Sequence, residues 1–430
     1  LSGKDRMIIP GLVDTHAHPT TEPIRKGITD ETVSPGFWHS SLYEHLPVFD
    51  PVDDQGRLAC LKVALAELLL SGVTTLVDLS SPFEGWEETL LDSGIRAFVA
   101  PCFRDARWFT TNGHSLEYDW NYEAGQRAFS TAREIVESAV RHPSGRLSAV
   151  VSPSQVDTCS EALLRDSHAF AQDHNLSWTI HAAQSVTEFQ EMQHRHGMTS
   201  VQWLDSLGVL NERSVIAHCI FLDHHPWLHW TSRKDLELLA DCESTVAHCP
   251  TVFSRRGIAL NTFGAYLDHG IRMSVGTDTY PHNMLDECRT AVMVARVIGQ
   301  SVTDLDCIDV FNAATVAGAD ALNRSDIGRL AVGCKADFST IDLTSPSMRP
   351  VREPLRSLIT VAGSRPVTDV FVHGEQVVSN GDVLNIDFEL ELTRLQVAQQ
   401  NMLNVVSEKD WDNRSAVELA PLMLTTVESI

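Results

Sequence analysis

The strongest constraint on the fold is a regular alternation of short apolar segments with longer helix-like ones between Met7 and Asp278. Eight segments rich in β-branched residues have the length of buried strands: 7–14, 73–79, 95–101, 147–152, 177–181, 214–218, 244–248 and 272–278. Helix-like stretches separate most of them, for example 55–70, 124–141, 161–174 and 234–240. Strand–helix alternation is typical of parallel sheets. Eight such units predict an α/β fold, a closed (β/α)8 barrel of the TIM type, in preference to a doubly wound open sheet.

After the eighth predicted strand, the regular alternation of strands and helices ends. Helical patterns at 286–298 and 303–322 are followed by β-rich segments at 337–343 and 367–378, and by a helix at 388–405. We therefore expect three parts: a metal-dependent (β/α)8 barrel over residues 1–330, a segment of a small accessory β-domain over 331–385, and a C-terminal helix and tail over 386–430.

Composition excludes several classes of partner. The formal charge is −24, from 33 Lys plus Arg against 57 Asp plus Glu, and such a field repels nucleic acid. The apolar stretches are too short to span a bilayer, and no secretory signal opens the chain. The nine cysteines are odd in number and lack C-x-x-C spacing, which favours a reducing cytoplasm. We expect a cytoplasmic homo-oligomer that acts on a partly apolar small molecule, without nucleic-acid or membrane partners.

Histidines and aspartates gather where the predicted strands end. The first strand runs into Asp14-Thr-His16-Ala-His18, and later strands end at His181, His218, His248 and Asp278. Barrel enzymes keep their catalytic groups at this rim. Residues two apart in a strand point to the same side, so His16 and His18 can bind one ion, with His181 and Asp278 approaching from other strands. Imidazole and carboxylate ligands suit zinc, and also iron, cobalt or manganese.

Four motifs carry a family resemblance. Pro10-Gly-Leu-Val-Asp-Thr-His-Ala-His18, Thr179-Ile-His-Ala-Ala-Gln184, Ala217-His-Cys219 and Val275-Gly-Thr-Asp278 resemble the amidohydrolase superfamily. They look most like its cytosine deaminase and chlorohydrolase branch, which includes triazine hydrolases, with phenylurea and thiocarbamate hydrolases as further candidates. The segment 327–337 resembles this branch's return to its β-domain.

The resemblance implies a mononuclear enzyme. It makes His16, His18, His181 and Asp278 the ligands of one divalent metal, with Zn²⁺ first and Fe²⁺, Co²⁺ or Mn²⁺ as alternatives. Asp278 also takes a proton from the attacking water, and His218 contacts that water or polarises the substrate. Two-metal relatives place a Lys at the end of the fourth strand, and this chain has none at 147–152. His248 receives no assignment, and Cys219 and Cys249, each directly after a strand-end His, stay open as ligands.

The chain departs from its branch at Gln184, where the deaminases carry a catalytic Glu, and at Ser154, where they carry a His. A Gln amide cannot transfer protons at neutral pH, and losing a general acid costs about 10² to 10⁴ in rate. The residues therefore favour hydrolysis of a C–N or C–S bond in an amide, urea or (thio)carbamate. The alternative is an aminohydrolase or dechlorinase of a nitrogen heterocycle, such as a triazine, purine or pyrimidine. A non-catalytic barrel is disfavoured because the predicted ligands are all present.

Two long connections, 19–51 and 102–122, are expected to form substrate walls and lids, with Trp38 and Trp108 in the pocket. Enzymes of the resembled branch also build the β-domain from both chain ends. Because only six residues precede Met7, we expect the natural polypeptide to be longer, and residues 337–380 to form a sheet with an unpaired edge.

Overall fold

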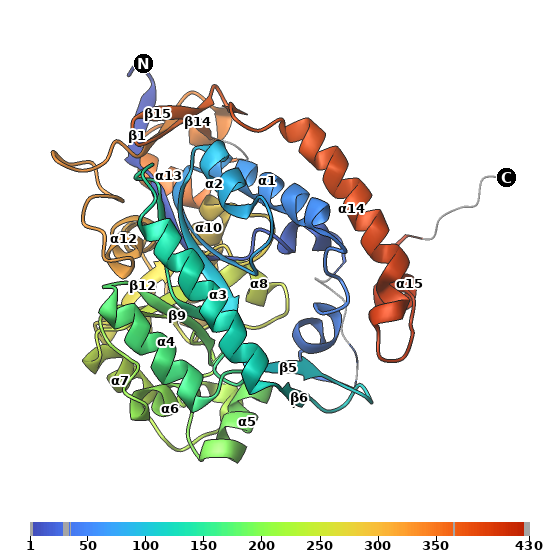
Figure 1. The fold of residues 1–430 in the computed structure, drawn as a ribbon. Coiled ribbons are helices and arrows are strands. Elements are labelled where there is room, and N and C mark those ends of the chain that lie inside the picture. The colour runs from blue at the N-terminus through green and yellow to red at the C-terminus, as the bar shows by residue number, and fades with distance from the viewer. Residues whose placement is uncertain (1–2, 29–33, 35, 364–365, 425–430) are drawn as a thin grey trace.

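The computed structural model describes residues 3–28, 34, 36–363 and 366–424, and its main body is built on parallel strands (Figure 1). One sheet has the order β2 (Leu12–Ala17), β3 (Val73–Ser80), β4 (Arg96–Phe103) and β7 (Leu147–Ala149), with the short β8 (Ser152–Pro153) also paired to β4. The other has the order β9 (Trp178–Ala182), β10 (Ser214–His218), β11 (Thr245–His248) and β12 (Arg272–Val275). Every pairing within these sheets is parallel. The predicted α/β fold is confirmed.

The two parallel sheets adjoin each other at both edges. A parallel bridge joins Ala17 to Asp278, and another joins Val151 to Trp178. Strands that follow one another in sequence are thus neighbours in space, and the carboxyl ends of β2, β9 and the segment after β12 come together.

Helices between the strands cover the sheets. They include α1 (Asp54–Leu70), α3 (Tyr122–Val140), α4 (Glu161–Asp173), α5 (Val186–His196), α7 (Asp235–Asp241) and α10 (Met284–Ile298). Side-chain caps set where two of them begin: Ser160 accepts from the Leu163 amide at α4, and Ser185 accepts from the Glu188 amide at α5. Such caps satisfy amides that have no partner inside a helix. The two caps thereby set where the connections after β8 and β9 end.

A third sheet is antiparallel and contains strands from both ends of the chain. Its order is β1 (Arg6–Pro10), β13 (Phe338–Asp342), β14 (Val367–Val372), β15 (Glu375–Ser379) and β16 (Asp382–Val383). Figure 1 shows the blue β1 beside the orange and red C-terminal strands. Within the described residues, β1 and β16 are the edges of this sheet.

The prediction of one strand over 7–14 was wrong, because the chain changes sheets at Gly11. β1 belongs to the antiparallel sheet and β2 to the parallel one. A Cβ on Gly11 would lie 2.0 Å from Thr74 Oγ1, so only glycine fits where the chain passes so close to β3. The predicted helix over 303–322 is also divided, into α11 (Cys307–Asn312), a π-helical turn η4 (Ala313–Ala317) and α12 (Gly318–Ala321).

The C-terminal helix α14 (Phe388–Lys409) is four residues longer than predicted and lies along α1 (Figure 1). Leu395, Met402 and Val406 of α14 pack with Ala59 and Val63 of α1 in one apolar cluster. Within the described part of the chain, none of the helices is long and apolar enough to cross a membrane.

Candidate metal centre

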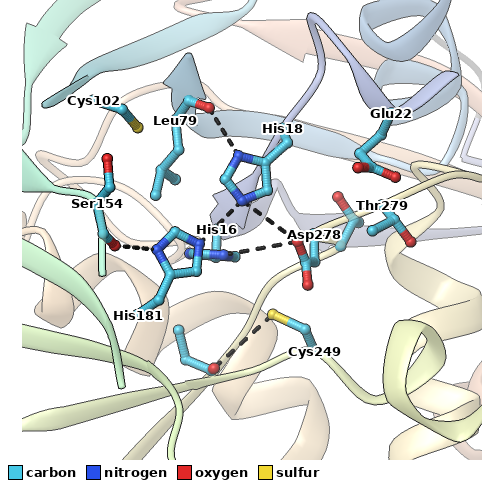
Figure 2. A network of polar contacts seen from close by, with 12 residues as sticks. His16, His18, Glu22, Leu79, Cys102, Ser154, His181, Cys249, Asp278 and Thr279 are labelled. Atoms are coloured by element: carbon cyan, nitrogen blue, oxygen red, sulfur yellow. Dashed lines mark hydrogen bonds and ion pairs between the residues drawn. The ribbon is translucent and has the colours of Figure 1, made fainter. Parts of the chain in front are cut away.

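Four strand ends bring their metal-ligating atoms to one point. One donor atom each from His16, His18 and His181 lie within 4.8 Å of one another, and so do donor atoms of His16, His218 and Asp278. Figure 2 shows His16, His18, His181 and Asp278 pointing toward a common centre. The structure therefore brings together the four predicted ligands and His218.

Backbone pairing holds the first strand against the last. The His18 amide donates to the Asp278 carbonyl at 3.0 Å, and the Asp278 amide donates to the His16 carbonyl at 2.8 Å. Beneath them the buried Asp14 carboxylate accepts from the His16 amide at 3.1 Å and from the Thr277 hydroxyl at 2.6 Å. Asp14 was not assigned a role from sequence, although its place two residues before His16 marked it as part of the same motif.

The orientation of two imidazoles fits a shared cation. His18 Nδ1 lies 2.9 Å from the Leu79 carbonyl oxygen, and His181 Nδ1 lies 2.5 Å from the Ser154 carbonyl oxygen. A carbonyl only accepts, so both Nδ1 atoms carry the hydrogen and both Nε2 atoms present lone pairs. These Nε2 atoms face each other at 3.1 Å. Lone pairs this close repel each other unless a positive ion lies between them.

Burial keeps His16 and His181 neutral, which is the form of the imidazole that binds metal. It lowers the pKa of His16, with His181 and His18 adding to the effect, and it lowers the pKa of His181 to about 3. Both ring nitrogens of His16 are buried and lack a hydrogen-bond partner within the described residues. A buried polar atom of this kind calls for a partner. His16 Nε2 lies 3.8 Å and His18 Nε2 lies 3.6 Å from the Asp278 carboxylate. The imidazole nitrogens and the carboxylate oxygen are therefore close enough to bind the same ion.

A cavity of about 640 Å³ opens above this cluster. Its floor includes His18, His181, His218 and Asp278, together with Gln184. Its walls come largely from the two long connections, and they include Glu22, Arg25, His39, Leu42, Asp50, Cys102, Arg104, Arg107 and Trp108. A volume of this size is usual for a small-molecule site.

The second long connection folds into a hairpin, β5 (Ala106–Phe109) and β6 (Glu117–Trp120), which the sequence analysis did not predict. Trp108 lines the cavity as expected, and its indole N–H donates to Asp157 at 2.9 Å. Trp38 is not among the lining residues. It is 43% exposed and packs on Phe221 and Trp227. Part of the first connection, residues 29–33 and 35, lies outside the described residues.

Gln184 lies in the cavity with an unpartnered donor. It is buried, and within the described residues its side-chain Nε2 has no hydrogen-bond partner. Glu188 holds the turn that carries it, because one carboxylate accepts from the Ala183 amide at 2.6 Å and the Gln184 amide at 3.1 Å. The side chain is thus positioned for a hydrogen bond to a ligand.

The remaining candidates separate into two groups. His218 lines the cavity and adopts a left-handed φ of 77°, which turns the chain sharply at the end of β10. His248 is buried against the Phe263 ring, with centroids 5.6 Å apart, and does not line the cavity. Burial raises the pKa of Cys219 and of Cys249 well above the usual range. These cysteines stay protonated thiols, and neither belongs to the donor groups found in the described residues.

Residues 7–377 match the amidohydrolase family. The chain belongs to this family. As an amidohydrolase it is a metal-dependent hydrolase of carbon–nitrogen bonds.

Several proteins resemble this amidohydrolase over most of its length. It is 24% identical to a 5'-deoxyadenosine deaminase of Methanosphaera stadtmanae, over 94% of this chain and 89% of the relative. It is 28% identical to a 5-methylthioadenosine/S-adenosylhomocysteine deaminase of Bacillus thuringiensis, over 90% and 85%. An adenosine deaminase from Xanthomonas campestris with bound zinc superposes with a TM-score of 0.80 at 23% identity, over 93% of this chain and 87% of the other. The zinc complex of atrazine chlorohydrolase from Arthrobacter aurescens gives 0.75 at 20% identity, over 93% and 91%.

Proposed function

We propose that this amidohydrolase uses one zinc ion to replace a substituent on a purine-type nitrogen heterocycle by a hydroxyl group. The observation that carries this choice is the similarity to deaminases of adenine nucleosides over at least 90% of the chain. It favours the heterocycle, the alternative drawn from sequence, over the amide, urea or carbamate.

The proposed framework is one closed (β/α)8 barrel, with the accessory sheet as a second unit that also contains residues 6–10. The bridges Ala17–Asp278 and Val151–Trp178 support closure because they join the two parallel sheets at both edges. We retain the expectation of a cytoplasmic homo-oligomer. Light scattering on the purified protein tests the oligomer.

His16, His18, His181 and Asp278 are the proposed zinc ligands. The facing Nε2 atoms of His18 and His181, the neutral imidazoles of His16 and His181, and the nearby Asp278 carboxylate all suit this ion. Zinc in related folds, the Xanthomonas and Arthrobacter enzymes, supports it further. A bound divalent ion lowers the pKa of water to about 7 and so supplies a nucleophile at neutral pH.

Side chains of the cavity have separate proposed roles in proton transfer and in substrate binding. The Asp278 carboxylate accepts a proton from the attacking water and returns it to the leaving group. His218 hydrogen-bonds to the group that gains charge on the ring. Gln184 donates through Nε2 to a ring nitrogen or another acceptor and holds the ring over the cluster. Trp108 and the hairpin that carries it limit access of bulk water.

Gln184 restricts the leaving group. A carboxylic acid at this position can protonate a ring nitrogen, whereas an amide cannot. Substituents that depart without a proton, such as chloride or thiolate, therefore suit this site better than an amine. The same neutral amide favours a second candidate, an amide, urea or carbamate, whose carbonyl needs only one proton delivered to the leaving group.

A substrate panel tests the proposal. The zinc-loaded protein is given purine nucleosides with amino, chloro or methoxy at carbon 6, chlorotriazines, and a set of amides, ureas and carbamates, and products are read by mass. We expect turnover among the heterocycles, with chloride released faster than ammonia. Turnover of the carbonyl compounds alone contradicts the heterocycle assignment.

The variant Gln184→Glu isolates the role of the amide. It supplies the missing acid, so we expect release of ammonia to rise by about 10²-fold or more while release of chloride changes little. Gln155→Glu is the matched control because it puts the same charge elsewhere in the cavity wall. An equal gain in both variants contradicts a specific role for position 184.

A further inference from the structure

Two arginines in the cavity wall have no ion-pair partner among the residues that the structure describes. Arg104 and Arg107 both line the cavity, and neither makes a hydrogen bond or an ion pair with any residue that the structure describes. Other arginines of the wall are neutralised. Arg25 pairs with Glu22 and Asp50, and Arg57 lies 3.4 Å from Asp54.

Asp105 is next to Arg104 in sequence, and the charge of Asp157 acts on Arg104, but both carboxylates accept hydrogen bonds from other groups. Asp105 accepts from the Ser160 amide at 2.9 Å and from its hydroxyl, at the start of α4. Asp157 accepts from the Trp108 indole at 2.9 Å and from the Tyr118 hydroxyl at 2.8 Å. Two further acidic residues of the hairpin, Glu117 and Asp119, are exposed. Glu117 accepts from the Thr111 hydroxyl at 3.1 Å, and Asp119 lies opposite Arg107 in the β5–β6 pairing without forming an ion pair with it.

Arg104 and Arg107 are exposed side chains that a ligand in the cavity can reach. The surrounding protein lowers the pKa of Arg104, and the charge of Arg107 lowers it further, whereas Cys102 and Asp157 raise it. The two cations therefore lie near each other at the cavity wall. Two neighbouring arginines without an ion pair among the described residues stand out in a chain with net charge −24.

We propose that Arg104 and Arg107 form a subsite for an anionic substituent of the substrate, a carboxylate or a phosphate. Guanidinium groups bind both anions through paired hydrogen bonds. The ring of the substrate lies over the metal cluster, where Gln184 Nε2 offers a second unpartnered donor. The subsite rests on the proposed function only for the nature of this ring, because the anion is recognised by the arginines themselves.

Direct binding tests the subsite without turnover. Benzoate and inorganic phosphate are titrated by calorimetry into the zinc-loaded wild type and into Arg104→Gln, Arg107→Gln and Arg127→Gln. Arg127 is the control because it lies on the outer surface of α3, paired only with Glu123. We expect Kd to rise about 10- to 100-fold in the first two variants, the loss typical of charged hydrogen bonds, and to stay unchanged in the third. The tighter of the two probes identifies the anion.

Two readouts separate the subsite from the reaction. Zinc content must stay at the wild-type level in all variants, and Arg104→Lys should recover part of the affinity. Anion affinity that is unchanged in both Arg104→Gln and Arg107→Gln overturns the subsite, because the anion is then held elsewhere, for example by the metal. If binding depends on the arginines but no heterocycle is turned over, the subsite stands and the assigned ring chemistry fails.

Discussion

The floor and the wall of the cavity are built in different ways. On the floor, strand ends supply His18, His181 and Asp278, and a hydrogen bond with a backbone group fixes each one. In the wall, the connection after β4 supplies Arg104 and Trp108. Trp108 donates to Asp157, and Arg104 has no hydrogen-bond partner among the described residues. Rigid strands suit groups that need precise geometry, whereas loops can change without loss of the fold. Under the proposed function, the reaction takes place at the floor and the wall selects the substrate.

We expect the largest loss of catalytic rate from a substitution on the floor of the cavity. Asp278→Asn keeps the shape of the side chain but removes the proposed proton acceptor and the charge of a proposed zinc ligand, so we expect kcat to fall by about 10² to 10⁴. Steady-state rates on the best substrate of the panel measure this. Asp326→Asn, a surface carboxylate paired with Arg324, is the control and should leave kcat unchanged. Wild-type kcat in Asp278→Asn would show that another group takes the proton.

The wall should produce a smaller effect of a different kind. Trp108→Ala removes a lining side chain and the indole bond to Asp157, so we expect kcat/KM to fall about tenfold, the size of one lost hydrogen bond with its packing. Zinc content should not change. Trp38→Ala, at a ring that lies outside the lining residues, should change kcat/KM less. Equal effects in both variants would remove the distinction between a pocket wall and an outer aromatic surface.

The smallest effect on rate is expected beneath the floor. Thr277 donates to Asp14 at 2.6 Å, and Thr277→Val removes this buried hydrogen bond. We expect the free energy of unfolding to drop by about 1 to 3 kcal/mol, measured by denaturant titration, with activity kept at saturating zinc. Thr303→Val, at an exposed hydroxyl that contacts only Ser301, is the control. A loss of activity as large as that in Asp278→Asn would mean that Asp14 and Thr277 act directly in the reaction.

The floor could be predicted from sequence and the wall could not, for a physical reason. His16, His18, His181 and Asp278 stand at the ends of recognisable strands, and parallel strands bring such ends to one edge. The switch at Gly11 was missed because the apolar run 7–14 continues through it, and only the contact with Thr74 reveals the change of sheets. The β5–β6 hairpin and the position of Trp38 depend on tertiary contacts that no local pattern encodes. The substrate preference drawn from sequence rested on Gln184 and Ser154, whereas the comparisons cover at least 90% of the chain.

The central claim is that the strand-end cluster binds one divalent metal ion on which hydrolysis depends. Elemental analysis of the purified wild type and of His181→Ala, together with activity after chelation and after return of zinc, tests it most directly. We predict about one zinc per chain in the wild type, almost none in the variant, and activity that disappears with chelation and returns with zinc. Two metal ions per chain, or full activity in a metal-free preparation, would contradict the claim.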